Sequence, residues 1–217
     1  MKISVLCSDP QHPVMEWLKA WIRKTTLRGH EVWLGNRKSE LPGGDVLFLV
    51  SCCEIIEPGV RARYRASLVL HASDLPVGRG WSPHVWGVLA GANEITVCLV
   101  EAGDPVDSGR IWLRKRVVLE GHELFDEINS ALFSAELALM TQVVEEFTSI
   151  KPEPQRPGGS WCRRRTPEDS RLDPAKSLAE QFNLLRVADS RRFPAFMDWR
   201  GRRYIVRIEK VEDDEQK

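Results

Sequence analysis

The stretch between residues 68 and 83 limits the possible folds more than any other part of the sequence. Residues 68–70 are apolar β-formers followed by turn residues, so they predict a buried strand that ends at His71. A loop rich in glycine and proline follows. Ser82 and Pro83 are then typical of the capped start of a helix, which we expect to reach Leu89. This order predicts an open α/β sheet, in which ligands bind beyond the carboxyl ends of the strands.

The same alternation of apolar runs and helical periodicity extends through the first 150 residues. The patterns predict strands at 2–7, 31–34, 46–50, 95–100 and 111–119, the last an outer strand, and helices at 14–27, 58–64 and 122–147. The turn after the first strand has no G-x-G-x-x-G, so a dinucleotide site of the usual kind is not supported.

The composition changes after residue 150. Residues 151–159 are rich in proline and glycine and are typical of a partly extended linker. Beyond them we expect a helix at 177–188 with Leu178, Phe182 and Leu185 inward, a hairpin of 195–199 with 203–208, and a fraying charged tail at 212–217. We therefore divide the chain into a domain at 1–150 and a small C-terminal subdomain at 151–217.

The charge balance and the cysteines exclude several functions. The 31 basic and 31 acidic residues give zero net charge, so the sequence lacks the excess of positive charge that is typical of nucleic-acid-binding proteins. The apolar stretch at residues 1–7 is too short and too soon interrupted to resemble a signal peptide, and no apolar run approaches about 18 residues, so we expect a cytoplasmic protein without a membrane partner. The five cysteines have no C-x-x-C spacing, which disfavours a zinc site or a disulfide framework.

Three separated motifs carry a family resemblance. They are His71-x-Ser73-x-Leu75-Pro76 with Arg79-Gly80 and Pro83, then Asp107-Ser108-Gly109, then Arg164-Arg165-Thr166-Pro167-Glu168-Asp169-Ser170. In this order they resemble the folate-dependent formyltransferases, over roughly residues 45–200. The sugar-amine branch, with its aminoarabinose-type members, is most similar, and the catalytic domain of methionyl-tRNA formyltransferase is related. The resemblance implies a Rossmann-like catalytic domain.

The resemblance also implies that His71 and Asp107 are the catalytic residues. Formyl transfer to an amine passes through a tetrahedral oxyanion, which needs a hydrogen-bonding or cationic group and a base for the amine proton. A carboxylate beside His71 favours the imidazolium that would stabilise the oxyanion. Without the family motifs, a lone histidine at a strand end is more often structural, and an aspartate before Ser-Gly is usually a turn former.

One position departs from the family pattern. The family has asparagine two residues before its catalytic histidine, where this chain has Val69. Loss of such an amide donor typically costs about 2.7–4 kcal/mol of transition-state stabilisation. Three outcomes stay open: Ser73 or a loop N–H replaces the donor, activity is low, or the protein binds ligands without catalysis.

The resemblance places the folate and the acceptor in neighbouring loops. The folate is expected against Cys52, Ile55, Ile56, Val100 and Asp104, although the two isoleucines are equally well ordinary core. The acceptor is expected against Arg79, Trp161, Arg164, Arg165 and Asn183. Arginine binds phosphate and indole stacks on bases, so residues 161–165 suit a nucleotide diphosphate, but a solvated charge run is the simpler alternative.

The expected activity is transfer of a formyl group from 10-formyltetrahydrofolate, without a metal, to the primary amine of a nucleotide-linked amino-deoxy sugar in glycan biosynthesis. The alternatives are methionyl-tRNA formylation, disfavoured by neutral charge and a short C-terminal unit, glycinamide ribonucleotide formylation, and an inactive folate- or sugar-binding homologue. The exposed edge of the C-terminal unit could pair with another copy as a homodimer.

Overall fold

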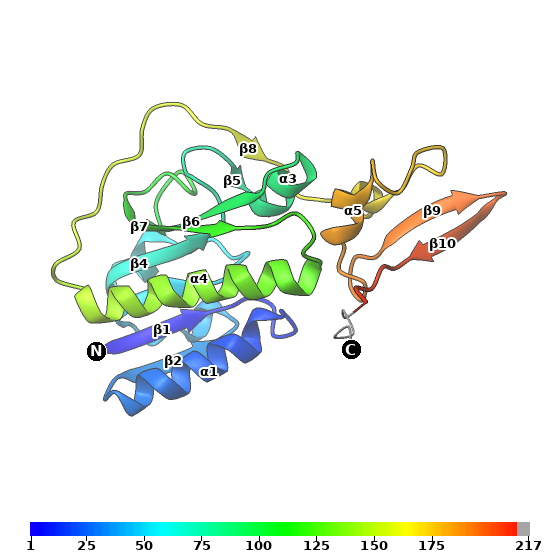
Figure 1. Cartoon of the computed structure of the whole chain (residues 1–217). Helices are drawn as coiled ribbons and strands as arrows, with labels where there is room; N and C mark the ends of the chain where they lie inside the picture. The colour runs from blue at the N-terminus through cyan, green and yellow to red at the C-terminus, as the bar shows by residue number, and fades with distance from the viewer. Residues whose placement is uncertain (212–217) are drawn as a thin grey trace, which may run out of the picture.

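The computed structural model describes residues 1–211 and is built on a six-stranded sheet (Figure 1). The strand order is β2-β1-β3-β4-β6-β7. The first four strands of this order run parallel, whereas β6 and β7 are antiparallel to their neighbours. The strands are β1 (Lys2–Leu6), β2 (Glu31–Gly35), β3 (Gly44–Leu49), β4 (Tyr64–His71), β6 (Glu94–Glu101) and β7 (Ile111–Val118). The predicted mostly parallel α/β sheet, with 111–119 as an outer strand, is confirmed.

Two long helices cover one face of this sheet. They are α1 (Val14–Leu27) and α4 (Phe125–Glu146), and the Trp21 Nε1–H of α1 donates to Thr141 Oγ1 of α4 over 2.8 Å. The apolar stripe of α4 packs with β1, β3 and β4 in one core, because a helix with this periodicity presents one side to the sheet. Two smaller apolar clusters lie on the opposite face, around Leu47 and around Val100. Burial on both faces explains why the central strands read as continuous apolar runs.

Helix α3 (Pro83–Leu89) follows the predicted loop, but it begins differently from the expectation. Pro83 occupies the first turn as predicted. The expectation that Ser82 caps the helix through its side chain is wrong, since Ser82 has left-handed backbone angles (φ 46°) and its side chain makes no capping bond. Its main-chain carbonyl instead accepts from Val85 N–H over 3.0 Å.

Two short elements complete the first 100 residues. Helix α2 (Pro58–Arg61) ends three residues earlier than predicted, because β4 begins at Tyr64, where the chain joins the register of β3 at Gly44. A 3₁₀ turn, η1 (Lys38–Glu40), connects β2 to β3. Neither difference alters the position of His71 at the end of β4.

The chain beyond α4 forms a second set of elements beside the sheet (Figure 1). They are β8 (Trp161–Cys162), which pairs with β5 (Arg79–Gly80), then η2 (Pro167–Ser170), α5 (Phe182–Arg186), and the antiparallel strands β9 (Ala195–Trp199) and β10 (Arg202–Val206). The predicted hairpin is confirmed, and the predicted tail at 212–217 lies outside the described residues.

The predicted helix at 177–188 is wrong in length, because only Phe182–Arg186 is helical. Residues 178–181 form turns instead, and side chains in this segment hydrogen-bond to nearby groups. Glu180 accepts from Ser177 N–H at 2.9 Å, and the Gln181 amide donates to Asp173 O at 3.0 Å. Leu178 is consequently 66% exposed rather than inward, whereas Leu185 is buried as expected.

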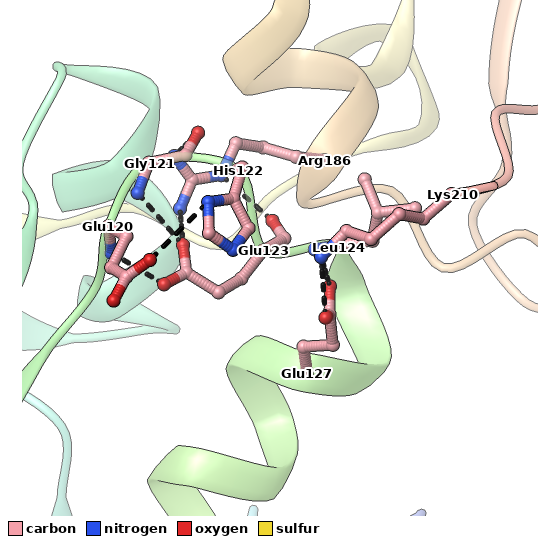
Figure 2. Close-up of polar contacts among 8 residues, drawn as sticks. All are labelled: Glu120, Gly121, His122, Glu123, Leu124, Glu127, Arg186 and Lys210. Atoms are coloured by element: carbon pink, nitrogen blue, oxygen red, sulfur yellow. Dashed lines mark hydrogen bonds and ion pairs between the residues drawn. The ribbon is translucent and has the colours of Figure 1, made fainter. Parts of the chain in front are cut away.

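Arg186 joins α5 to the start of α4 (Figure 2). Its side chain is buried and donates to Gly121 O at 2.6 Å, to Glu123 O at 3.0 Å and to Glu123 Oε2 at 3.1 Å. Burial opposes ionisation of Glu123, but backbone N–H donors, among them those of Glu120 and Gly121, together with Arg186 hold its pKa below the usual range. Arg186 is thus a buried residue that connects α5 to the start of α4.

Within residues 1–211, the helices are all too short or too polar to cross a membrane.

Candidate active site

His71 ends β4 at the point where the parallel part of the sheet meets the antiparallel part. The ring is buried, and its Nε2 lies 2.8 Å from Gly78 O. Because a carbonyl can only accept, Nε2 carries the proton of this bond, and Nδ1 is left to face the site. Gly78 has φ +76°, and a Cβ there would lie 3.0 Å from Ser73 Cβ, so glycine lets the loop bring its carbonyl over the ring.

Asp107 reaches the free side of this ring from the loop between β6 and β7. Its Oδ1 lies 3.7 Å from His71 Nδ1, and its Oδ2 accepts from Gly80 N–H at 2.9 Å. Asp107 itself has left-handed backbone angles (φ 58°). A Cβ at Gly109 would lie 2.0 Å from Glu101 O, which explains glycine at the end of the Asp107-Ser108-Gly109 motif. The structure therefore brings together the two side chains expected to meet.

The side chains of Val69 and Ser73 direct no hydrogen-bond donor at this pair. Val69 lies two residues before His71 on the same face of β4 and packs partly buried against the clusters of Leu49 and Val100. Ser73 Oγ–H donates to Gly78 O at 3.2 Å, the same carbonyl that His71 uses. The hydroxyl proton of Ser73 is thus directed at the loop, and His71 Nδ1 is the polar atom left facing Asp107.

The residues expected on the folate side lie in different environments. Ile56 is 4% exposed and Val100 is fully buried, so both side chains belong to the core, whereas Ile55 is 57% exposed. Asp104 is exposed and forms an ion pair with Arg61. Cys52 Sγ accepts from Ser8 Oγ–H at 3.3 Å, and burial raises the pKa of its thiol.

The residues expected on the acceptor side meet through a short parallel pairing. Arg79 pairs with Trp161 in the register of β5 and β8, and Trp161 is 63% exposed. The Arg164 guanidinium lies over the Trp81 ring, 4.9 Å from its centroid. Arg165 donates to Asp169 O at 3.1 Å and to Ser170 Oγ at 3.3 Å.

Two further residues lie near these side chains. His84 was not predicted as a site residue, and Asn183, which was predicted, lies at the edge of the site. His84 on α3 is near His71, His12 and Arg165, and burial together with these neighbours lowers its pKa to about 4. Its Nδ1 and Arg165 Nε are buried without a hydrogen-bond partner in the described part of the chain. Asn183 lies half-buried on α5, which packs against α3. A histidine inside a short apolar helix gives no local sequence signal for such a position.

A separate hollow of about 340 Å³ lies at the other end of the strands. It is lined by residues at the amino ends of β1 and β3, among them Ser4, Gly44 and Arg63. Ligands of open α/β sheets bind at the carboxyl edge, which is where His71 and Asp107 lie. We therefore assign the site to the His71 edge.

A buried imidazole facing a carboxylate at this edge is an arrangement that could carry out the proton transfers of a group-transfer reaction. The sequence matches the family model described as Formyl transferase over residues 35–144, just over half of the chain. The chain therefore belongs to the formyl transferase family.

Sequence relatives include methionyl-tRNA formyltransferases. The protein of this name from Malacoplasma penetrans is 28% identical over 122 residues, which are 54% of this chain and 38% of that protein. The chain spans about half the length of the curated relatives it matches, from 38% to 56% in the first eight.

Solved structures share the fold over nearly the whole chain. Methionyl-tRNA formyltransferase from Clostridium thermocellum has a TM-score of 0.81 at 18% identity, covering 99% of this chain and 95% of that one. HypX from Aquifex aeolicus, in complex with tetrahydrofolic acid, has a TM-score of 0.81 at 20% identity, covering 96% and 37%. A 4-N formyltransferase from Francisella tularensis has a TM-score of 0.73 at 16% identity, covering 97% and 98%.

Proposed function

We propose that the protein transfers the formyl group of 10-formyltetrahydrofolate to the primary amine of a nucleotide-linked amino sugar. The observation that carries this proposal is the approach of His71 Nδ1 to Asp107 Oδ1 at 3.7 Å, both side chains being buried. This pair supplies a hydrogen-bond donor and a proton acceptor on one side of a single ring.

The chemistry follows from the bonds that these two groups already make. The acceptor amine attacks the formyl carbon, and protonated His71 Nδ1–H donates to the oxygen that becomes negative. Asp107 accepts the proton that the amine loses and returns it to N10 of the folate as the carbon–N10 bond breaks. Atoms and charge balance, and the products are the formamide and tetrahydrofolate.

We propose that the pterin binds against the loop between β3 and α2, on one side of the His71–Asp107 pair. Ile55 is exposed at its rim, and Lys38 Nζ donates to Ile55 O at 2.9 Å, which holds the loop. Lys38 also pairs with Glu57 at the end of the loop. A held loop that offers backbone groups and an apolar side chain suits a flat heterocycle carrying several hydrogen-bonding atoms.

We propose that the acceptor, an anionic molecule that carries a nucleotide base, binds on the other side of the pair, against β8 and the segment after it. Arg164 stacked on Trp81 offers a planar cation on an aromatic face, and Trp161 is exposed beside it. Arg165 Nε is buried without a partner within residues 1–211, and His84 lies next to it. Arginine donors beside exposed indoles suit a nucleotide diphosphate. Arg163, in contrast, already forms an ion pair with Asp169.

The test is a formylation assay on the full chain with four acceptors: a panel of nucleotide-linked amino sugars, the free amino sugars, methionyl-tRNA and glycinamide ribonucleotide. Tetrahydrofolate release and the mass of the product are measured. We expect turnover with a nucleotide-linked amino sugar, and a decrease in kcat of about 10²–10⁴ in Asp107→Asn. This substitution keeps an oxygen for Gly80 N–H.

The four acceptors separate the alternatives. Turnover on methionyl-tRNA, the substrate named for the curated relatives, or on glycinamide ribonucleotide instead of any sugar would contradict the proposed acceptor. Folate binding without turnover on any amine would identify an inactive homologue. Arg164→Ala should raise KM for the nucleotide-linked sugar while leaving the free sugar unaffected.

A further inference from the structure

Residues 152–162, which we call the strap, connect the two loops that carry the site. The strap follows α4 and runs over the outside of the sheet before it reaches β8 (Figure 1). At its start, Ile111 and Glu153 exchange two backbone hydrogen bonds of 2.8 Å. At its end, β8 pairs with β5. A segment with the composition of a flexible linker is therefore held at both ends.

The side chain of Gln155 bridges the middle of the strap to the Asp107 loop. Its Nε2 donates to Asp107 O at 2.7 Å and to Gly109 O at 2.9 Å, and its Oε1 accepts from an Arg79 guanidinium N–H at 2.9 Å. One amide thus uses both of its N–H groups and its oxygen. Gln155 is half-buried, whereas its neighbours Pro154 and Arg156 are exposed.

The carbonyl that Gln155 holds belongs to a residue in a sparsely populated backbone conformation. Asp107 has φ 58°, and non-glycine residues keep such angles only when their surroundings fix them. Fixing the Asp107 carbonyl fixes the rotation of its peptide and hence the direction of its Cβ. The carboxylate then points at His71 Nδ1 on one side and at Gly80 N–H on the other.

The same strap also fixes the carbonyl that binds His71. Ser160 Oγ accepts from Gly78 N–H at 2.9 Å, and Ser160 O accepts from Arg79 N–H at 2.9 Å. Gly159 lies against Pro76, where a Cβ would come within 2.2 Å of Pro76 O. The strap thereby holds the peptide of Gly78, whose oxygen accepts from His71 Nε2–H.

From these contacts we infer that the strap sets the geometry of the dyad and that Gln155 is a positioning residue for Asp107. The inference rests on the proposed function, because it assumes that His71 and Asp107 carry the reaction.

The experiment compares three variants of the full chain. Gln155→Glu keeps the acceptor for Arg79 but removes both donors to the carbonyls, Gln155→Ala removes the whole bridge, and Arg156→Ala changes an exposed neighbour as the matched control. Losing one or more such hydrogen bonds should lower kcat by about tenfold or more in both Gln155 variants. KM for folate and for the acceptor should stay within about twofold, as expected for a change in the reacting geometry alone.

A second readout is independent of turnover. The titration of the His71 ring is followed by NMR in protein with ¹⁵N-labelled histidine, with the signal assigned through His71→Gln. We expect the uncharged variant Gln155→Ala to move this titration in the same direction as Asp107→Asn, because both weaken the approach of the carboxylate to Nδ1. Arg156→Ala should leave the titration unchanged.

The outcomes decide between the two proposals. Wild-type kcat and wild-type His71 titration in Gln155→Ala would overturn the positioning role, as would a loss of kcat accompanied by an equal rise in KM and a lower Tm. If no acceptor is formylated by any form of the protein but Gln155→Ala still moves the His71 titration, the positioning role stands and the proposed function fails.

Discussion

The side chains of His71 and Asp107 are each hydrogen-bonded by a main-chain group of the loop at residues 78–80. Gly78 O fixes the ring of His71, and Gly80 N–H fixes one oxygen of Asp107. The position where the family has an amide is Val69, which has apolar neighbours. Among these three side chains, His71 therefore presents the polar atom that faces Asp107, its Nδ1.

The hydroxyl of Ser73 offers a test of this arrangement. Because its proton is directed at Gly78 O, we expect Ser73→Ala to lower kcat by less than about fivefold and the free energy of unfolding by about 1 kcal/mol. Steady-state assays and urea denaturation measure the two quantities. A decrease in kcat as large as that of Asp107→Asn would mean that Ser73 turns to the substrate and replaces the missing amide.

At the scale of elements, α5 depends on one buried side chain. Arg186 is 1% exposed and bonds two carbonyls and the Glu123 carboxylate. Arg186→Met should lower the free energy of unfolding by about 3 kcal/mol, because it leaves two buried carbonyls without their donor and removes the charge partner of Glu123. Chemical denaturation gives the value, and exposed Arg200→Ala is the control, expected within about 0.5 kcal/mol of the parent. Equal values for the two variants would contradict the connector role.

The elements also show how far the sequence could predict the fold. Helix α4 was expected within a few residues, and the β9–β10 hairpin within two, because their periodicity is local and is repeated over many residues. Helix α5 was too long in the prediction, because residues 178–181 form turns that the apolar periodicity does not reveal. The strap was expected only as a linker, because a segment rich in proline and glycine shows no helical or strand periodicity. The hydrogen bonds of Gln155 could not be foreseen either, since they go to carbonyls more than 40 positions away.

The candidate site, like the fold, could be predicted from the sequence only in part. Motifs around His71 and Asp107 predicted that the two side chains would meet, and the structure brings them to 3.7 Å. Their catalytic roles and those of the residues beside them stay predictions. Environment could not be foreseen for Val100, which is core, or for Asp104, which is paired with Arg61, because burial depends on the packing of the whole molecule.

For the molecule as a whole, the acid most sensitive to burial is Glu136 on α4. It is buried, its Oε2 has no hydrogen-bond partner within residues 1–211, and burial raises its pKa to about 8. Between the unfolded pKa near 4.5 and this value, the folded state keeps the proton and the unfolded state loses it. Stability from this group is therefore complete below pH 4.5 and decreases as the pH rises towards 8.

Glu136→Gln should remove this loss. We expect the variant to gain on the parent by at most about 1.4 kcal/mol per pH unit between pH 5 and 8, and the difference to level off above that range. Urea denaturation at intervals of one pH unit measures the gain, with exposed Glu146→Gln on the same helix as control. A difference that does not change with pH would mean that Glu136 ionises freely in the folded protein.

The order of the strap in the chain has a consequence for synthesis on the ribosome. His71 and Asp107 leave the exit tunnel before Gln155 and Ser160 do. A nascent chain of 150 residues can therefore pair every strand of the main sheet while the Asp107 loop still lacks its hydrogen bonds to the strap. The geometry of the His71–Asp107 pair should then be completed late and abruptly, when residues 152–162 emerge and close over loops that were made first.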